Sequence, residues 1–276
     1  MSYETLDIKL ENGVAWLTLN RPRALNALSY TMVEEFHDYF AKLRTDSDTR
    51  VVVMRGAGRA FCAGIDLKEN SPKGAEGDAP DPESLGGSVI RTIELQRRIS
   101  TVVVAIQRLP QPFIAAVRGP ATGGGFSLSL ACNVRIAAES ARFNAAFVKV
   151  GLSGCDMGSS YFLPRAVGTS VAFELLTTGR FVDARRALAT GLVSEVVPDA
   201  DLDAAAGKLA AEMCEMSPLG LAMTKECILA NLEAGSVESA VAMEDRTQAL
   251  CVKAGYLAEG ARAFVEKRKP RFAARA

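Results

Sequence analysis

Two short stretches rich in small residues carry the first chemical information in this chain of 276 residues. Residues 56–67 read GAGRAFCAGIDL, and residues 117–132 read VRGPATGGGFSLSLAC. Each follows an apolar run, so each predicts a buried strand that leads into a glycine-containing turn. Two such turns can direct two backbone N–H groups at one point, the arrangement that stabilises an oxyanion. Either stretch alone is interpreted as an ordinary tight turn, but the pair in this order favours an oxyanion hole.

The glycine triplet at residues 123–125 opens a predicted helix with the sequence FSLSLAC. Glycine permits close backbone approach and unusual dihedral angles. The free N–H groups at the start of a helix favour a ligand with negative charge. No acid or base follows within this helix, so the turn predicts a binding site whose proton-transferring group lies elsewhere.

One acid, Asp156, stands out in the stretch GLSGCDMGSSYFLPR at residues 151–165. A general base needs an elevated pKa, which an apolar surrounding provides. The alternative is that Asp156 caps a helix beginning near Gly158, a common use of aspartate. The residues predicted to form an apolar pocket around it are Met157, Tyr161, Phe162, Phe126 and Phe147.

Other catalytic classes fit the sequence less well. The stretch GPATGGGF does not match the G-x-G-x-x-G pattern of a dinucleotide site, and GLSGC lacks the final glycine of a nucleophile elbow. The only histidine, His37, lies on an early predicted helix, so a Ser-His-Asp triad has little support. His37 is predicted to be a surface or half-buried helical residue.

The amino-acid composition indicates which binding partners and which cell compartment to expect for this protein. Lysine plus arginine equals aspartate plus glutamate, 32 each, so no overall field attracts nucleic acid or a membrane surface. The six cysteines form no C-x-x-C pair, which argues against a zinc site or a disulfide scaffold and favours the cytoplasm. The N-terminus lacks the features of a signal peptide, and the longest uncharged run is too short to span a bilayer.

Alternating strand and helix patterns predict an α/β fold with parallel strands. Residues 4–22 predict two strands around a turn at Asn12-Gly13, and Ser29 is predicted to cap the next helix. Residues 70–87 predict a mobile surface loop that can act as a lid, followed by a helix from Val89 to Pro110. Beyond Val197 the chain is predicted to be almost entirely helical, with Ser217 capping a helix that begins at Pro218. The predicted organisation is an α/β core over residues 1–198 and a helical region over residues 199–276.

Taken together, five stretches resemble the crotonase superfamily, the enoyl-CoA hydratases and isomerases, over essentially the full length. They are NRPRALNAL, GAGRAFCAGIDL, FIAAVRGPATGGGFSLSLAC, LLTTGRFVDARRALATGLVSEVVP and AFVEKRKPRF. The resemblance implies a spiral of ββα units, a C-terminal region that trimerises and covers coenzyme A, and a homotrimer or a dimer of trimers. It also implies an acyl-CoA thioester substrate, with no cofactor beyond the coenzyme A that the substrate carries and no metal.

The same resemblance assigns the site residues. The N–H groups of Ala63 and Gly124 are expected to hold the thioester oxygen as it becomes an enolate. Cations are expected at the CoA phosphates, and Phe264 is expected to pack on CoA, across a subunit interface. The implied substrate-binding residues are Arg23, Ala24, Leu25, Arg59, Ala63, Gly64, Ile65, Asp66, Leu67, Gly123, Gly124, Ser127, Phe147, Phe264 and Lys267.

The chain departs from the hydratase pattern at both usual glutamates, which are replaced by Ser127 and Phe147. Serine is a weak base without an activating partner, and phenylalanine transfers no proton. Asp156 falls where the dienoyl-CoA isomerase branch has a catalytic aspartate, so it is the preferred acid/base. Two interpretations remain: a hydratase or isomerase that moves protons with Asp156, or a non-catalytic acyl-CoA binding protein. The sequence does not indicate the acyl chain.

Overall fold

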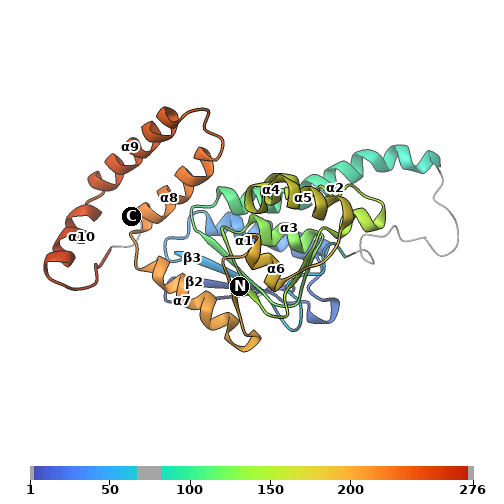
Figure 1. Cartoon of the computed structure of the whole chain (residues 1–276), viewed down its shortest axis with the longest axis horizontal. Helices are drawn as coiled ribbons and strands as arrows, with labels where there is room; N and C mark the ends of the chain where they lie inside the picture. The colour runs from blue at the N-terminus through green and yellow to red at the C-terminus, as the bar shows by residue number, and fades with distance from the viewer. Residues whose placement is uncertain (1–2, 67–81, 273–276) are drawn as a thin grey trace.

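The computed structural model describes residues 3–66 and 82–272, which form two β-sheets and the helices around them (Figure 1). In the larger sheet β1 and β2 are antiparallel, and every later neighbour pairs in parallel. Asn12 and Gly13, with φ of 51° and 82°, form the hairpin turn that the sequence predicted. The strand order is β1 (Leu6–Glu11), β2 (Val14–Leu19), β3 (Val51–Gly56), β4 (Phe113–Val117), β6 (Val134–Ala138) and β9 (Glu195–Val197).

A smaller sheet of three short strands lies where the chain approaches the glycine triplet. It has the order β5 (Pro120–Thr122), β7 (Arg142–Asn144) and β8 (Val182–Asp183). The helices up to β9 are η1 (Pro22–Ala24), α1 (Tyr30–Leu43), α2 (Pro82–Arg108), α3 (Gly124–Ala131), η2 (Ala146–Val150), α4 (Ser159–Val167), α5 (Thr169–Thr178) and α6 (Ala184–Ala189). This mixed α/β architecture confirms the predicted fold class.

Both faces of the central strands β3 and β4 of the large sheet are buried, as is typical of parallel strands. Side chains alternate along each strand, so Val51 and Val53 pack toward α7 (Leu202–Cys214) while Val52 and Met54 join the core formed with α1, α2 and α3. Figure 1 shows α7 on the opposite side of the strands from α3. The packed large sheet therefore provides a rigid base for the loop that follows β3, while β5 of the smaller sheet leads into the glycine triplet.

Capping residues begin helices at the positions that the sequence predicted. The Ser29 hydroxyl accepts the Met32 N–H at 3.1 Å, and the Ser217 hydroxyl accepts the Gly220 N–H at 3.1 Å. The start of α2 differs from the prediction, because this helix begins at Pro82 rather than after Gly87. Proline suits the first turn of a helix, and the two glycines at 86 and 87 each cost a helix only about 1 kcal/mol. Residues 70–81 of the predicted loop lie outside the described residues.

The C-terminal helices extend away from the sheet, with α9 packed between α8 and α10 (Figure 1). Their bounds are α8 (Pro218–Asn231), α9 (Val237–Lys253) and α10 (Tyr256–Val265), after the short η3 (Asp199–Asp201). Large apolar side chains on them are exposed, among them Val237 at 70% and Phe264 at 85%. A role of residues 199–276 in trimer formation remains a prediction. None of the helices in the described ranges has the length and apolar character needed to cross a bilayer.

Candidate active site

The loop after β3 is fixed by two single-residue parallel bridges, Cys62 with Ala121 and Ile65 with Leu28. Leu28 donates its N–H to the Gly64 carbonyl at 2.7 Å and accepts the Asp66 N–H at 3.0 Å. Because residue 65 lies between these two bonds, its own N–H and C=O point away from Leu28. Within residues 3–66 and 82–272 the Ile65 N–H has no hydrogen-bond partner.

Ala63, the predicted oxyanion donor, is already engaged within the chain. Its N–H donates to the Leu25 carbonyl at 3.0 Å, and its carbonyl accepts the Thr122 hydroxyl at 2.8 Å. The prediction for Ala63 therefore conflicts with the observed bond. The available amide is that of Ile65, two residues further along. Sequence spacing alone does not distinguish these amides, because the bridge to Leu28 decides which one faces outward.

The glycine triplet provides a second available amide. Gly123 has φ of 50° and ψ of −121°, a conformation that favours glycine, and its N–H donates to the Asn144 carbonyl at 2.9 Å. Gly124 is the first residue of α3, and its N–H lacks a partner in the described part of the chain. The positive end of the α3 dipole adds to the potential at this amide.

The two turns lie against each other. Gly64 has φ of 99°, and a Cβ there would lie 2.9 Å from the Thr122 carbonyl oxygen and 3.5 Å from the Gly124 nitrogen. A Cβ on Gly124 would lie 3.0 Å from Cδ1 of Leu28 and 3.1 Å from Sδ of Met157. The backbone amides at this point are therefore bordered by apolar side chains, which strengthen electrostatic interactions by excluding water.

Asp156 lies in the turn before α4, next to Met157. Its Oδ1 accepts the Met157 N–H at 2.7 Å and also accepts Nε2 of Gln96 from α2. Burial raises the pKa of Asp156, and these two hydrogen bonds oppose the rise. Helix α4 begins at Ser159 and has no side-chain cap, so the alternative that Asp156 caps it is not supported.

The residues at the two positions of the missing glutamates have structural contacts. Ser127 is completely buried, and its hydroxyl donates to the backbone carbonyl of Asp156 at 3.0 Å. The ring of Phe147 lies against Gly123, with Cε1 at 3.5 Å from where a Cβ would be. Neither residue supplies an acid or base, and Ser127 ties α3 to the turn that carries Asp156.

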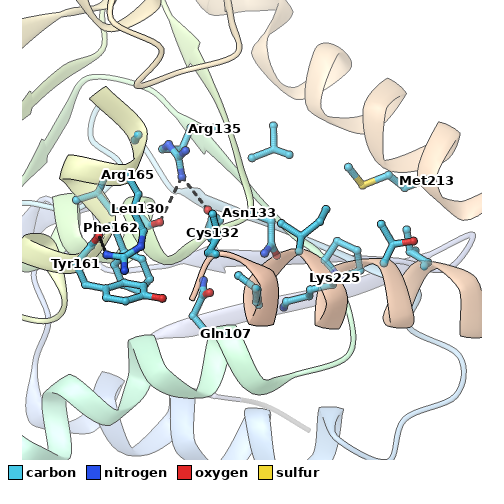
Figure 2. Close-up of a pocket in the computed structure, with 18 residues that line it drawn as sticks. Gln107, Leu130, Cys132, Asn133, Arg135, Tyr161, Phe162, Arg165, Met213 and Lys225 are labelled. Atoms are coloured by element: carbon cyan, nitrogen blue, oxygen red, sulfur yellow. Dashed lines mark hydrogen bonds between the residues drawn. The ribbon is translucent and has the colours of Figure 1, made fainter. Parts of the chain in front are cut away.

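The apolar residues predicted around Asp156 are grouped only in part. Met157, Phe126 and Phe147 belong to one hydrophobic core, and Phe162 packs against it. Met157 and Phe147 lie at the glycine turns, whereas Phe126 packs on Phe143 with ring centroids 6.0 Å apart. Tyr161 and Phe162 line a different cavity of about 380 Å³, bordered by Leu130 and Cys132 at the other end of α3 (Figure 2). The sequence did not predict this cavity, which the adjacent residues Tyr161 and Phe162 of α4 both line.

Three cations line this cavity, and Figure 2 shows them around the end of α3. Arg135 donates to several carbonyls, including that of Cys132 at 2.8 Å, and Arg165 lies 3.6 Å from the centre of the Tyr161 ring. Lys225 is buried, and its ammonium donates to the carbonyls of two residues near the end of α2, each at 2.8 Å.

Burial lowers the pKa of Lys225 to about 7. Its pKa in the unfolded chain is about 10.4, so between about pH 7 and pH 10 the unfolded state binds more protons and folding stability rises with pH. Lys225→Met also removes two hydrogen bonds, a loss present at both pH values, so we expect its effect on Tm, relative to the wild type, to be more favourable at about pH 6 than at about pH 9. Differential scanning fluorimetry at both values measures this, and an equal difference at the two pH values contradicts it.

The predicted cations of the N-terminal half lie on neighbouring turns. Arg23 is on η1, Arg59 follows the loop glycine Gly58, and both side chains are exposed. A Cβ on Gly58 would lie 3.1 Å from Cβ of Pro22, so these turns are in close proximity. Ala24 and Leu25 complete the η1 turn and are half-buried.

The remaining predicted residues lie in different parts of the chain. Asp66 is half-buried and pairs with Arg21 at 2.9 Å, a contact that braces the first turn and that the sequence did not predict. Leu67 lies outside the described residues. Phe264 is exposed on α10 and Lys267 is exposed just after it. Figure 1 shows that α10 lies far from α3 of the same chain.

His37 is half-buried on α1, as predicted, and its ring contacts the Arg98 carbonyl.

Several known proteins are similar to this chain in sequence and in fold. The family model described as Enoyl-CoA hydratase/isomerase matches residues 9–275. A Mycobacterium bovis protein named "Probable enoyl-CoA hydratase echA12" is 41% identical over 228 residues, 82% of this chain and 77% of the relative. The 1,2-epoxyphenylacetyl-CoA isomerase of Escherichia coli is 35% identical, over 95% of this chain and 96% of the relative. The crystal structure of an enoyl-CoA hydratase from Bacillus anthracis superposes with a TM-score of 0.87 and 33% identity, covering 98% of this chain and 99% of that one. The chain therefore belongs to the enoyl-CoA hydratase/isomerase family of the crotonase superfamily.

Proposed function

We propose that this enzyme binds an acyl-CoA thioester with its oxygen between the amides of Ile65 and Gly124, and that Asp156 moves a proton at a neighbouring carbon. The observation that carries the proposal is the proximity, on adjacent turns, of one half-buried carboxylate and two amides that have no partner among residues 3–66 and 82–272. Abstraction of the Cα proton by Asp156 places negative charge on the thioester oxygen. The two N–H groups stabilise that charge, and one such donor typically contributes about 10²–10³-fold in rate.

A reaction that only relocates a proton suits this site better than hydration. Hydration requires a base that activates water and an acid that protonates carbon, whereas Ser127 and Phe147 replace the usual glutamates. One carboxylate can accept a proton from one carbon and return it to another, which shifts a double bond. The similarity to 1,2-epoxyphenylacetyl-CoA isomerase, whose name describes an isomerisation, supports this choice.

Contacts to the coenzyme A part of the substrate are proposed from the positions of four side chains. Arg23 and Arg59, exposed on adjacent turns, are proposed to contact the CoA phosphates. Phe264 and Lys267 are proposed to reach the CoA of a neighbouring copy in a homotrimer or a dimer of trimers, because α10 lies away from the site of its own chain (Figure 1). Six free cysteines support a cytoplasmic location.

Isothermal titration calorimetry with crotonyl-, decenoyl- and acetyl-CoA tests the binding step. We expect a saturable heat with at least one of these thioesters and no requirement for metal or nicotinamide. Free coenzyme A is the control, because it retains the phosphates and lacks the carbonyl that the amides hold. Absence of any binding or competition contradicts the proposal, and tight binding without turnover favours a non-catalytic acyl-CoA binding protein.

A further inference from the structure

The two carboxylate oxygens of Asp156 have different environments. Oδ1 accepts two hydrogen bonds, from the Met157 N–H and from Nε2 of Gln96. Oδ2 accepts none from the residues that the structure describes. An oxygen that is already saturated by two donors is the poorer proton acceptor, so the asymmetry selects Oδ2 for proton transfer.

The backbone of Asp156 is also held in place, by hydrogen bonds to two serines. The Asp156 carbonyl accepts the Ser127 hydroxyl at 3.0 Å and the Ser159 N–H at 2.9 Å, while its N–H donates to the Ser159 hydroxyl at 3.1 Å. Met157 follows with φ of 47°, a conformation that is uncommon for a residue with a side chain. Ser127 and Ser159 are both fully buried, so these bonds are protected from competition with water.

We propose that Gln96 and Ser127 are positioning residues, which hold Asp156 through its Oδ1 and its carbonyl so that Oδ2 faces the carbon that loses the proton. The inference rests on the proposed function, because it assigns the base to Asp156. It gives the serine that replaces a glutamate a role that needs no proton transfer by Ser127 itself. It also gives a role to Gln96, which lies 60 residues away in sequence and has no recognisable motif.

The charged groups near Asp156 are few in the described part of the chain, so the hydrogen bond from Gln96 has a share in setting its pKa. Burial and the bonds from Met157 and Gln96 account for the altered pKa of Asp156, without a contribution from any charged side chain of the described residues. The titratable or charged neighbours in sequence are Cys155 on the same turn and Glu94, Arg97 and Arg98 on α2. Of these, Arg98 is paired with Glu34.

Gln96→Leu removes the side-chain donor to Oδ1. Because a hydrogen bond to the charged form lowers the pKa of an acid, its loss raises the pKa of Asp156. The acid limb of the pH profile of kcat/KM then moves to higher pH, and kcat on the plateau falls roughly ten-fold because the carboxylate can rotate. Gln96→Lys keeps a donor and adds a positive charge, so it moves the same limb to lower pH.

Ser127→Ala removes the other support and is expected to lower kcat roughly ten-fold with little change in KM. The matched control is Ser129→Ala, since Ser129 is equally buried in α3 but donates to the Phe126 carbonyl of its own helix at 2.7 Å. Gln107→Leu is the control for Gln96→Leu, because its amide donates from α2 to the Ala131 carbonyl, away from Asp156. Neither control should change the pH profile.

The measurement is deuterium exchange at Cα across a pH series, combined with infrared difference spectra that follow the protonated Asp156 carboxyl without requiring turnover. Opposite shifts in Gln96→Leu and Gln96→Lys, in both readouts, support the inference. An unchanged Asp156 titration in Gln96→Leu overturns it, even if Asp156→Asn is inactive and the proposed function stands. Full exchange by Asp156→Asn instead contradicts the proposed function itself.

Discussion

Asp156→Asn is expected to lower kcat for proton transfer by about 10²–10⁴-fold while acyl-CoA affinity changes little. Asparagine keeps the shape of the side chain and an oxygen that can still accept the Met157 N–H and the Gln96 amide. It loses only the ability to take a proton at neutral pH. A large fall in kcat at constant affinity therefore separates chemistry from binding.

The matched control for this variant is Asp183→Asn. Asp183 caps α6 by accepting the Arg186 N–H at 2.8 Å, and asparagine caps nearly as well. Both variants replace one carboxylate by an amide, but only the Asp156 variant should lose activity. Stopped assays by mass spectrometry give kcat, and calorimetry gives the affinity. Equal activity of the two variants, both near the wild type, would remove Asp156 from the mechanism.

Gly124→Pro is expected to lower kcat/KM by a further 10²–10³-fold, roughly, beyond the loss in Gly124→Ala. Gly124 is the first residue of α3, where proline is well tolerated because the N–H makes no helical bond. Proline removes the amide donor, while alanine keeps it. Both variants place a Cβ near the flexible ends of Leu28 and Met157, at 3.0 and 3.1 Å, so the Cβ contributes equally to both. Proline also places its Cδ where the amide hydrogen was, so it removes the donor and fills the space in front of it.

The Tm values of Gly124→Pro and Gly124→Ala show whether both variants fold equally well, which the comparison of their kcat/KM requires. Similar Tm values with very different kcat/KM would place the thioester oxygen at the Gly124 nitrogen, where proline replaces the N–H by Cδ. Gly125 is unsuitable for this test, because a Cβ there would overlap the Cys62 backbone carbonyl. If the proline variant is as active as the alanine variant, the Gly124 amide does not stabilise the transition state.

Local chemistry explains which elements could be predicted from the sequence. The hairpin at Asn12-Gly13 and the helix starts at Ser29 and Ser217 depend on residues close in sequence. The buried strand β3 was predicted from a continuous run of apolar residues. In each case the deciding interaction lies within a few residues of the element, so no tertiary information was needed.

The site was less predictable, because its geometry depends on contacts between distant segments. The bridge between Leu28 and Ile65 turns the Ile65 amide outward, whereas the Ala63 amide is used by Leu25. The contact of Gln96 with Asp156 joins segments 60 residues apart, and no pattern in the sequence marks it. The position of Asp156 in the site-forming turn was predicted from the family resemblance, not from periodicity.

The central claim is that one carboxylate relocates a proton without adding water. The most direct measurement is the reaction of a β,γ-enoyl-CoA in water labelled with both deuterium and ¹⁸O, analysed by mass spectrometry. We predict an α,β-enoyl-CoA product without ¹⁸O, which carries deuterium only in those turnovers in which the proton held by Asp156 exchanges with solvent. Asp156→Asn should form this product at least about 10²-fold more slowly. A 3-hydroxyacyl-CoA labelled with ¹⁸O as the main product, formed directly by the wild type, would contradict the claim.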